Sequence, residues 1–377
     1  MAQDEHELLC IGNSLVDVFA CADAEMAAKY GILEPIQHVD IEKLLALLYE
    51  LETNSRRRAC VPGEFNTACP QENLSFTEVS SGGGGANAAK IAALLGSKVS
   101  FIGAIGSGVS KEKAGREREL PDGFGKFFKE TLSSAGVELK LKVKPSPTGI
   151  CLMLAITGGE TRIAASPSAA LELSASDIGE EDIQKARIIV VDGYLLSRPP
   201  LVRRILDLAE RSGKTVALDL GSPAMAEEYA LEISGYARQN SLILFMNEAE
   251  ARRFHKKITK AECGMLDEKP FPKKLCEFFM TFTLEERFPI VTVKLGERGA
   301  LCFSGGAMME AKTEAVIPAD TTGAGDAFCA GFLTALLRGK SIGVCADIGN
   351  RAARIVLDAK GTALSGEHFT GVTDLSS

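Results

Sequence analysis

The sequence predicts an α/β fold in which helices flank a mostly parallel sheet, with a small antiparallel β-sheet beside it. Short runs rich in Val, Ile and Leu alternate with longer helical patterns, which is typical of βαβ units around a buried sheet. Gly or Pro residues mark the starts of several helical patterns. Other stretches alternate apolar and polar residues, as strands with one uncovered face do.

The parallel strands are expected where a brief apolar run is bounded by polar residues or glycine. They are Leu8–Ile11, Val99–Ile102, Ile188–Val191, Thr215–Leu218, Leu242–Phe245 and Ile290–Val293. Crossover helices are expected where apolar residues recur at helical spacing after a start signal. They are Ala86–Leu95, Pro200–Arg211 and Ala327–Leu337.

The alternating stretches predict a lid made of a few short strands. They are Leu15–Ala20, Leu74–Ser80, Ile150–Thr157 and Thr161–Ala165. We therefore expect residues 1–377 to form a single α/β domain, with lid strands from about residues 13–40, 74–81 and 148–166. The polar, Pro-containing segments 52–71 and 256–272 are expected to be surface loops.

Composition narrows the classes of function. The chain is 46% hydrophobic and 24% charged, as globular proteins are, and its net charge of −8 gives no broad positive field for nucleic acid. No apolar run approaches the ~18 residues that span a bilayer, and the N-terminus is acidic where a signal peptide would be basic. The ten cysteines lack zinc-ligand spacing. These features predict a cytoplasmic protein without nucleic-acid or membrane partners.

The strongest chemical signal is the segment 320–328, Asp-Thr-Thr-Gly-Ala-Gly-Asp-Ala-Phe, directly before an apolar helix. The small residues Gly323, Ala324 and Gly325 allow backbone N–H groups to approach an anion at a helix N-terminus. The carboxylate of Asp326 follows, where it could accept a proton from an attacking hydroxyl. A capped helix with a tight glycine turn is the alternative interpretation.

Two segments in the N-terminal third have the chemistry of a polyol site. Glycines such as Gly82 and Gly83 allow close backbone approach to a substrate, and Asn87 can donate to and accept from hydroxyls. Asn13 and Asp17 follow the first expected strand, at the carboxyl end where open α/β sheets bind ligands. A flexible glycine linker and a simple turn at Asp17 are the alternatives.

These segments together resemble the signatures of the PfkB/ribokinase family of carbohydrate and nucleoside kinases, in the family's order, from about residue 8 to residue 364. The resemblance implies a ribokinase-like fold and transfer of the γ-phosphoryl group of ATP to an alcohol. It implies that Asp326 is the catalytic base and that Gly323, Ala324 and Gly325 form the anion hole.

The resemblance also implies the contacts with both substrates. The expected substrate-binding residues are Asn13, Asp17, Gly82, Gly83, Asn87 and Arg162, the last in an imperfect match to a lid motif. The expected nucleotide-binding residues are Asn247, Lys294, Gly296, Gly299 and Asn350. Lys294 stands where many family members have Thr, and Asn350 could equally be a surface residue.

A metal is implied by Asn247 and Glu250, which resemble a family motif that orders Mg²⁺, usually through water. The same pair is also a common helix cap. The resemblance implies ATP and Mg²⁺ as cofactors and leaves a monovalent cation open. It also leaves open a monomer or a homodimer through the lid.

Several segments, such as Asp192–Leu196 and Asp219–Pro223, resemble the adenosine-kinase-like branch of the family, which also contains sugar kinases. The chain has no Trp with which to sandwich a purine, which favours a sugar or sugar-like substrate. Adenosine or another nucleoside is the alternative. A non-catalytic sugar or nucleotide sensor on the same fold is the second alternative.

Overall fold

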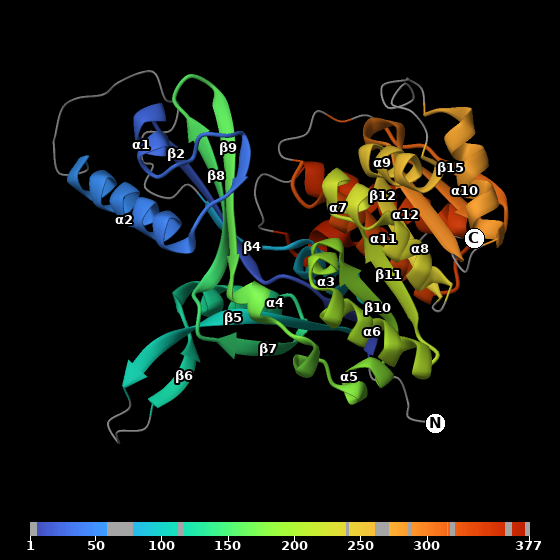
Figure 1. The fold of residues 1–377 in the computed structure, drawn as a ribbon, viewed down its shortest axis with the longest axis horizontal. Helices are drawn as coiled ribbons and strands as arrows, with labels where there is room; N and C mark the ends of the chain where they lie inside the picture. Colours follow the sequence, from blue (N-terminus) through green and yellow to red (C-terminus); the bar gives the residue numbers. More distant parts are fainter. Residues whose placement is uncertain are drawn as a thin grey trace.

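The computed structural model describes residues 6–58, 78–111, 117–238, 241–260, 271–285, 289–314, 316, 321–358 and 364–373. Asp320, the first residue of the strongest motif, lies outside these ranges. The described residues form a large layered α/β part and a smaller sheet that stands beside it (Figure 1).

The large sheet has the order β15-β14-β13-β12-β11-β10-β1-β5-β6. All six predicted parallel strands are confirmed: β1 (His6–Ile11), β5 (Val99–Lys111), β10 (Ala186–Asp192), β11 (Thr215–Asp219), β12 (Leu242–Asn247) and β13 (Ile290–Lys294). At the edges, β6 (Glu117–Pro121), β14 (Ala300–Ser304) and β15 (Ala307–Ala311) pair antiparallel, and β7 (Glu138–Lys144) pairs with β5 in parallel. The parallel strands end at a common edge, where their last residues meet.

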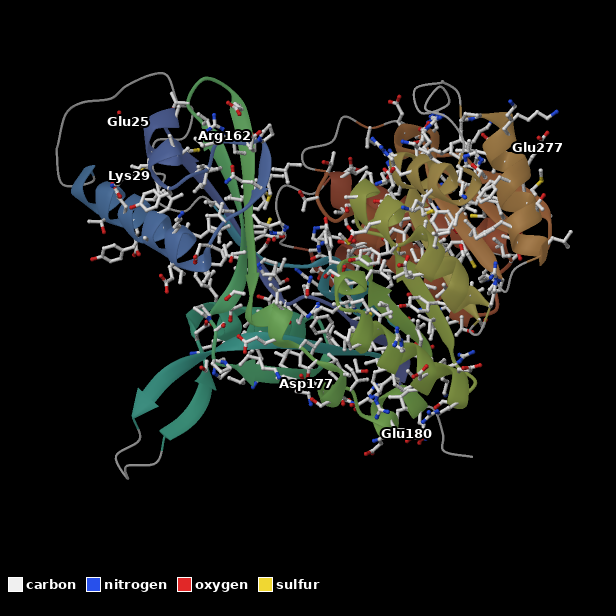
Figure 2. The ribbon with its side chains drawn as sticks, in the orientation of Figure 1. Glu25, Lys29, Arg162, Asp177, Glu180 and Glu277 are labelled. Carbon is white, nitrogen blue, oxygen red and sulfur yellow. The ribbon has the colours of Figure 1, made fainter. Side chains whose placement is uncertain are left out.

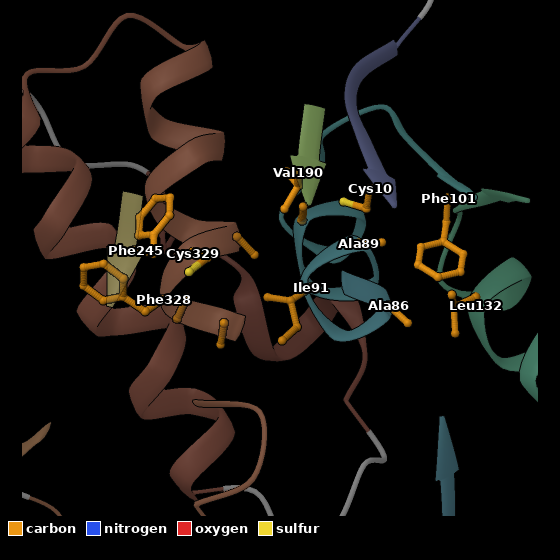
Figure 3. Close-up of a cluster of buried hydrophobic side chains, with 14 of the residues drawn as sticks. Cys10, Ala86, Ala89, Ile91, Phe101, Leu132, Val190, Phe245, Phe328 and Cys329 are labelled. Carbon is orange, nitrogen blue, oxygen red and sulfur yellow. The ribbon is translucent and has the colours of Figure 1, made fainter. Parts of the chain in front are cut away.

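One face of the large sheet is covered by α3 (Gly84–Leu94), α11 (Ala324–Leu337) and α12 (Ile342–Asp358). Figure 3 shows Cys10, Val190 and Phe245 of three strands beside Ala89 of α3 and Phe328 of α11, all of them buried. Burying a side chain of the size of Val or Phe stabilises a fold by about 1.5–3 kcal/mol. This packing fixes the two helix N-termini against the sheet.

The opposite face is covered by another layer of helices. It comprises α5 (Glu180–Gln184), α6 (Pro199–Arg211), α7 (Pro223–Glu228), α8 (Ala230–Ala237), α9 (Glu248–Thr259) and α10 (Lys273–Glu285). The strand residues between those of the first face, including Leu9, Val191 and Leu244, pack here. Because both faces are covered, the strands read as nearly continuous apolar runs, and this made them predictable.

The three predicted helices are present with adjusted starts. α3 begins at Gly84 rather than Ala86, and α11 begins at Ala324 rather than Ala327. In both cases the glycine before the helix, Gly83 or Gly323, is its N-cap. Glycine has weak helix propensity, and Gly84, Gly85 and Gly325 stand in these first turns, so the sequence pattern alone delays the predicted start.

The small sheet contains β2 (Leu15–Ala22), β3 (Ile36–His38), β4 (Glu78–Gly82), β8 (Thr148–Ile156) and β9 (Glu160–Ser168), in the order β3-β9-β8-β2-β4. The expectation of antiparallel pairing holds for β2–β4 and β8–β9, but β2–β8 and β3–β9 are parallel. The difference arises because β2 and β8 belong to chain segments that both leave the large sheet and run outward side by side (Figure 1).

One face of the small sheet is covered by two helices, α1 (Ala24–Lys29) and α2 (Ile41–Arg58). Val16 and Val18 of β2 and Leu152 of β8 pack in one buried cluster with Leu44 and Leu47 of α2. The two helices lie on the side away from the large α/β part (Figure 1). The other face of the small sheet therefore looks toward that part.

Both predicted surface loops need correction. Residues 52–58 belong to α2. The apolar stripe from Leu44 to Leu51 packs on the small sheet and stabilises this helix, which continues into the polar residues that follow. Residues 256–259 likewise belong to α9, and the remaining residues 59–71 and 261–270 lie outside the described ranges.

Among the described helices, none is both long and apolar enough for a membrane span. α4 (Gly123–Ser134) completes the helices that support the small sheet.

Candidate active site

The glycine turn between β4 and α3 passes between two functional groups. A Cβ on Gly82 would overlap the carboxylate of Asp17, and a Cβ on Gly83 would overlap the main-chain oxygen of Asn13. Gly83 has φ 94°, a conformation that residues with a side chain disfavour. The run is therefore a close-packed turn and not a flexible linker, and it brings Asn13 and Asp17 to the start of α3.

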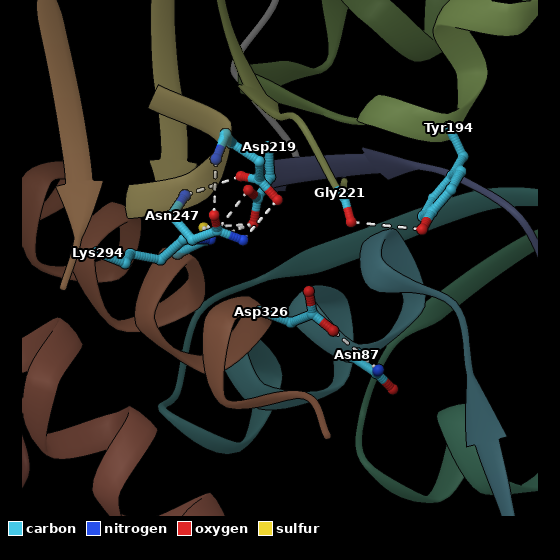
Figure 4. A network of polar contacts seen from close by, with 9 residues as sticks. Asn87, Tyr194, Asp219, Gly221, Asn247, Lys294 and Asp326 are labelled. Carbon is cyan, nitrogen blue, oxygen red and sulfur yellow. Dashed lines mark hydrogen bonds and ion pairs between the residues drawn. The ribbon is translucent and has the colours of Figure 1, made fainter. Parts of the chain in front are cut away.

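Asp326 lies in the first turn of α11 and faces the same glycine turn. Asn87 of α3 donates through Nδ2 to Asp326 Oδ2 at 2.9 Å (Figure 4). A Cβ on Gly84 would lie 3.3 Å from Asp326 Oδ1. Gly323 caps the helix with φ 77°, and the N–H groups of the first turn have no acceptor within α11, although the N–H of Ala324 donates to the Thr321 oxygen at 3.4 Å. Carboxylate, amide and helix N-terminus therefore converge as the motifs predicted.

The environment of Asp326 raises its pKa to about 7. Burial is the largest cause, and the negative charges of Asp219 and Asp192 add to it. The hydrogen bond from Asn87 and the charge of Lys294 act in the opposite direction. A carboxylate with a pKa near neutrality is a better proton acceptor than an ordinary one, and it remains largely ionised just above that pH.

Lys294, at the end of β13, forms a partly buried ion pair close to the same helix end. Its Nζ lies 2.8 Å and 2.9 Å from the two carboxylate oxygens of Asp219 at the end of β11 (Figure 4). Cys329 of α11 donates through Sγ to Asp219 at 3.0 Å. A Cβ on Gly325 would lie 3.2 Å from Lys294 Nζ. Burial is the largest single influence on the pKa of Lys294 and lowers it, but the negative charges of Asp219, Cys329 and Glu250 and the hydrogen bond to Asp219 together outweigh burial, so the pKa is raised.

Asn247 and Glu250 form a reciprocal helix cap at the start of α9. Asn247 donates through its backbone N–H and through Nδ2 to the two Glu250 oxygens, at 2.8 Å and 2.7 Å, and Glu250 N–H donates back at 2.9 Å. Burial and the charge of Asp219 raise the pKa of Glu250 to about 7. The capping alternative is therefore realised in this conformation.

The oxygen atoms of Asn247 and Glu250 suit Mg²⁺ only if water molecules lie between them and the ion. Both oxygens of Glu250 already accept hydrogen bonds from Asn247. Within the described ranges, no cluster of three or more His, Cys, Asp or Glu side chains could hold a metal. Carboxylate and amide oxygens beside a phosphate site still suit an ion that keeps most of its water, as Mg²⁺ commonly does.

The other predicted nucleotide residues frame the turn after β13. Gly296 and Gly299 flank it with φ 63° and 85°, and a Cβ on Gly299 would overlap the main-chain oxygen of Ala311. Asn350 of α12 is buried, not on the surface, and donates through Nδ2 to the same Ala311 oxygen at 3.1 Å. These residues fix β15 to the turn and so shape the predicted nucleotide side.

Two charged groups on the substrate side were not among the predicted site residues, although Asp192 begins one of the segments that resemble the adenosine-kinase-like branch. Asp192, the last residue of β10, is buried and accepts from Tyr194 N–H at 3.0 Å. Burial raises the pKa of Asp192, while the amides of Tyr194, Asn13 and Gly85 oppose the shift. Arg198 donates through Nη2 to Asn13 Oδ1 at 2.6 Å. Both groups stabilise the backbone and the amide of the predicted substrate-binding turn.

The sequence contained one usable signal for the missed residues. Asp192 and Asp219 each end a buried parallel strand, the place where α/β sheets present functional side chains. Arg198 and Cys329 carried no such signal, because their partners are distant in the sequence.

Arg162 is not brought to the group around Asp326. Its Nη1 donates to the Ile32 oxygen at 2.7 Å, and its Nε and Nη2 pair with Glu160. Figure 2 shows Arg162 in the outer part of the small sheet, on the β8–β9 hairpin. In this conformation its guanidinium joins β9 to the segment between α1 and β3 and does not line the predicted phosphate site.

The arrangement is that of a phosphotransferase. A carboxylate with a raised pKa stands at a helix N-terminus that suits a phosphate, beside amide and carboxylate groups that suit hydroxyls. The chain belongs to the pfkB family of carbohydrate kinases, whose family model matches residues 52–368.

Particular relatives agree with this placement. The chain is 24% identical over 374 residues to adenosine kinase 2 of Arabidopsis thaliana, covering 94% of each chain. It is 28% identical over 290 residues to ribokinase of Haemophilus influenzae, covering 76% of this chain and 84% of the ribokinase. The crystal structure of adenosine kinase from Sinorhizobium meliloti superposes with a TM-score of 0.72 at 21% identity, covering 96% of this chain and 97% of that one.

The predicted ribokinase-like fold class is therefore confirmed. The predicted class of activity is confirmed as well: the protein is an ATP-dependent kinase that phosphorylates an alcohol group of a sugar or nucleoside.

Proposed function

We propose that the acceptor is a nucleoside whose sugar lies beside Asp17, Asn13 and Asn87 and whose base lies on the open face of the small sheet. The proposal rests on the uncovered face of the small sheet. This face carries apolar side chains, whereas a free sugar requires mainly polar partners for its hydroxyls. The sequence favoured a sugar, and adenosine was the alternative; the arrangement of the small sheet reverses that order.

A row of apolar side chains crosses the open face next to Asp17. Phe19 of β2 is paired with Met153 of β8, Met153 with Ile163 of β9, and Ile163 with Ile36 of β3. Side chains two residues apart on a strand share a face and lie roughly 7 Å apart. Phe19 therefore stands on the face of Asp17, about one sugar ring further along β2. A flat base attached to the sugar would cover this row.

The proposed chemistry uses Asp326 as the general base. The attacking hydroxyl lies between Asp326 and the glycine turn, and Asp326 accepts its proton as the oxygen bonds to the γ-phosphorus of ATP and ADP leaves. The N–H groups of Gly323 to Gly325 stabilise the charge on the transferring phosphoryl group. The hydrogen bond from Asn87 holds the carboxylate in place for this step.

The cation requirement is also part of the proposal. Asn247 and Glu250 would hold Mg²⁺ through water, and the ion would neutralise phosphate charge when bound. The Lys294 ammonium, packed against Gly325, supplies positive charge on the same side.

The small sheet is proposed to close as a lid and exclude water. Its edge strands β3 and β4 leave a monomer or a lid-paired homodimer as the states that sedimentation would distinguish.

The test is ADP release with Mg²⁺-ATP against adenosine, other nucleosides, D-ribose, hexoses and sugar acids. We expect turnover with a nucleoside at lower KM than with D-ribose. Preferred turnover of a free sugar would contradict the nucleoside proposal and restore the sugar alternative. Turnover of none of the nucleosides in the panel would contradict it as well.

A matched pair of variants tests the apolar row directly. Met153→Asp places a charge in the row, so it should raise the KM for a nucleoside about 10-fold or more while changing the KM for D-ribose far less. Met308→Asp is the control, because Met308 is exposed on the edge strand β15 of the large sheet. If Met153→Asp raises the KM for the nucleoside and for D-ribose equally, the apolar row is not the binding surface for the base.

A further inference from the structure

Arg198 links three parts of the substrate side from the first residue before α6. Its Nη2 donates to Asn13 Oδ1 at 2.6 Å, and its Nη1 donates to the Ala170 oxygen at 2.5 Å and the Leu173 oxygen at 3.5 Å. Ala170 and Leu173 lie directly after β9, where the chain leaves the small sheet. The guanidinium is therefore held at both ends, by the substrate-binding turn and by the base of the small sheet.

This contact dictates the orientation of the Asn13 amide. A guanidinium has only donors, so the group that faces it must be the oxygen of Asn13 and not the nitrogen. The Nδ2 group then points away from Arg198, and within the described part of the chain it has no protein acceptor. Asn13 is nearly buried, so reorientation of its amide would leave Arg198 facing another donor.

The electrostatic setting suits a fixed role for Arg198. Burial lowers its pKa, and the charge of Asp192 opposes that effect. Among the described residues, the buried Nε of Arg198 has no hydrogen-bond partner, so the guanidinium depends on the bonds made by its two Nη groups. Lys could not replace it, because one ammonium does not present two groups in a planar fork.

We propose that Arg198 is a positioning residue of the acceptor site: it holds the oxygen of Asn13 so that Nδ2 is presented as a donor to the acceptor hydroxyls, beside the carboxylate of Asp17. The pair then offers one donor and one acceptor to neighbouring hydroxyls of the sugar. This inference rests on the proposed function, which places the acceptor sugar against Asn13 and Asp17. It adds a residue that does not itself touch the substrate.

A double-mutant cycle tests the proposal by steady-state kinetics with adenosine, or with D-ribose if adenosine is not phosphorylated. Arg198→Met should raise the acceptor KM on the order of 10-fold, as expected for loss of one oriented hydrogen bond, while the KM for ATP stays within about 2-fold. The same substitution in an Asn13→Ala background should add almost nothing, because the amide it orients is absent. A purely structural role would give additive effects in the two backgrounds.

The outcomes separate this inference from the proposed function. If Asn13→Ala leaves the acceptor KM unchanged, the assignment of the acceptor site fails. If Asn13→Ala raises it but Arg198→Met does not, or if the two effects add, only the role of Arg198 is overturned. Arg203→Met is the control, because Arg203 is an exposed arginine one turn further along α6.

A second variant is needed if Arg198→Met folds poorly, which a lowered melting temperature would reveal. Arg198→Lys keeps the charge but cannot bridge Asn13 and Ala170 together. A raised acceptor KM in Arg198→Lys supports the positioning role, and an unchanged acceptor KM overturns it.

Discussion

In the large sheet, helices cover both faces, and Asp192, Asp219 and Lys294 stand where the strands end. In the small sheet only one face is covered, and Asp17 and the row from Phe19 to Ile36 lie on the other. Fully packed layers hold reacting groups rigidly, whereas a half-covered sheet can move and present a recognition surface. The difference supports the proposal that the large α/β part carries the chemistry and the small sheet carries acceptor recognition.

The largest expected effect tests the chemical half of this comparison. Asp326→Asn should lower kcat on the order of 10²–10⁴-fold, because the proton acceptor is lost while the contact with Asn87 can persist. In the wild type, kcat/KM should fall as pH decreases below about 7, the pKa of Asp326. An unchanged rate in the variant, or a pH-independent wild type, would contradict the assignment of the base.

The raised pKa of Asp326 also has a consequence for stability, with a definite sign. Between its ordinary pKa of 3.8 and about 7, the native state binds the proton more tightly than the unfolded state. Stability from this group is therefore present at low pH and is lost as pH rises to about 7. Asp326→Asn should be more stable than the wild type at pH 8 and gain little at pH 4 in denaturant titrations.

A smaller effect is expected from the partly buried ion pair at the carboxyl ends of β11 and β13. Lys294→Met should lower the free energy of unfolding by about 3 kcal/mol, the lower end of what breaking a buried pair costs, because it leaves the largely buried Asp219 without its partner. Adding Asp219→Asn should recover part of the loss. Lys256→Met is the control, since its pair with Glu227 is more exposed and is expected to contribute at most about 1 kcal/mol. Equal losses of unfolding free energy in Lys294→Met and Lys256→Met would show that the Lys294–Asp219 pair contributes no more than an exposed pair.

The glycine turn tests the recognition half of the comparison. Gly82→Ala places a methyl group against the Asp17 carboxylate, and such overpacking costs about 1–3 kcal/mol. The acceptor KM should therefore rise roughly 5- to 100-fold, with a smaller change in the KM for ATP. Gly343→Ala is the control, because a Cβ there meets open space. Equal increases in both KM values would show that the turn serves the two substrates alike.

The smallest effect is expected at Arg162. Arg162→Gln should change kcat and both KM values less than about 3-fold, because the side chain already bonds to Ile32 and Glu160 within the small sheet. A loss of 10-fold or more in kcat would mean that Arg162 leaves these partners on closure and reaches the phosphate.

The predictable part of the fold and site was local. The parallel strands were recognisable because burial on both faces makes them apolar throughout, as in Ile188–Val191. The helix end around Gly323 and Asp326 was recognisable because small residues and a carboxylate must follow one another there. The starts of α3 and α11 were misplaced because the glycines in these first turns have weak helix propensity and hide the helix start from the sequence pattern.

The sequence by itself determined where the buried strands lie along the chain and the chemistry of the two glycine-containing turns, because each depends on residues that are neighbours in the chain. Only the tertiary structure decided that Lys294 pairs with Asp219, that Arg198 holds Asn13, and that Phe19, Met153 and Ile163 share one row. These pairs join residues distant in sequence, and no local pattern encodes them. Their geometry follows from strand order, register and packing, which are properties of the folded chain.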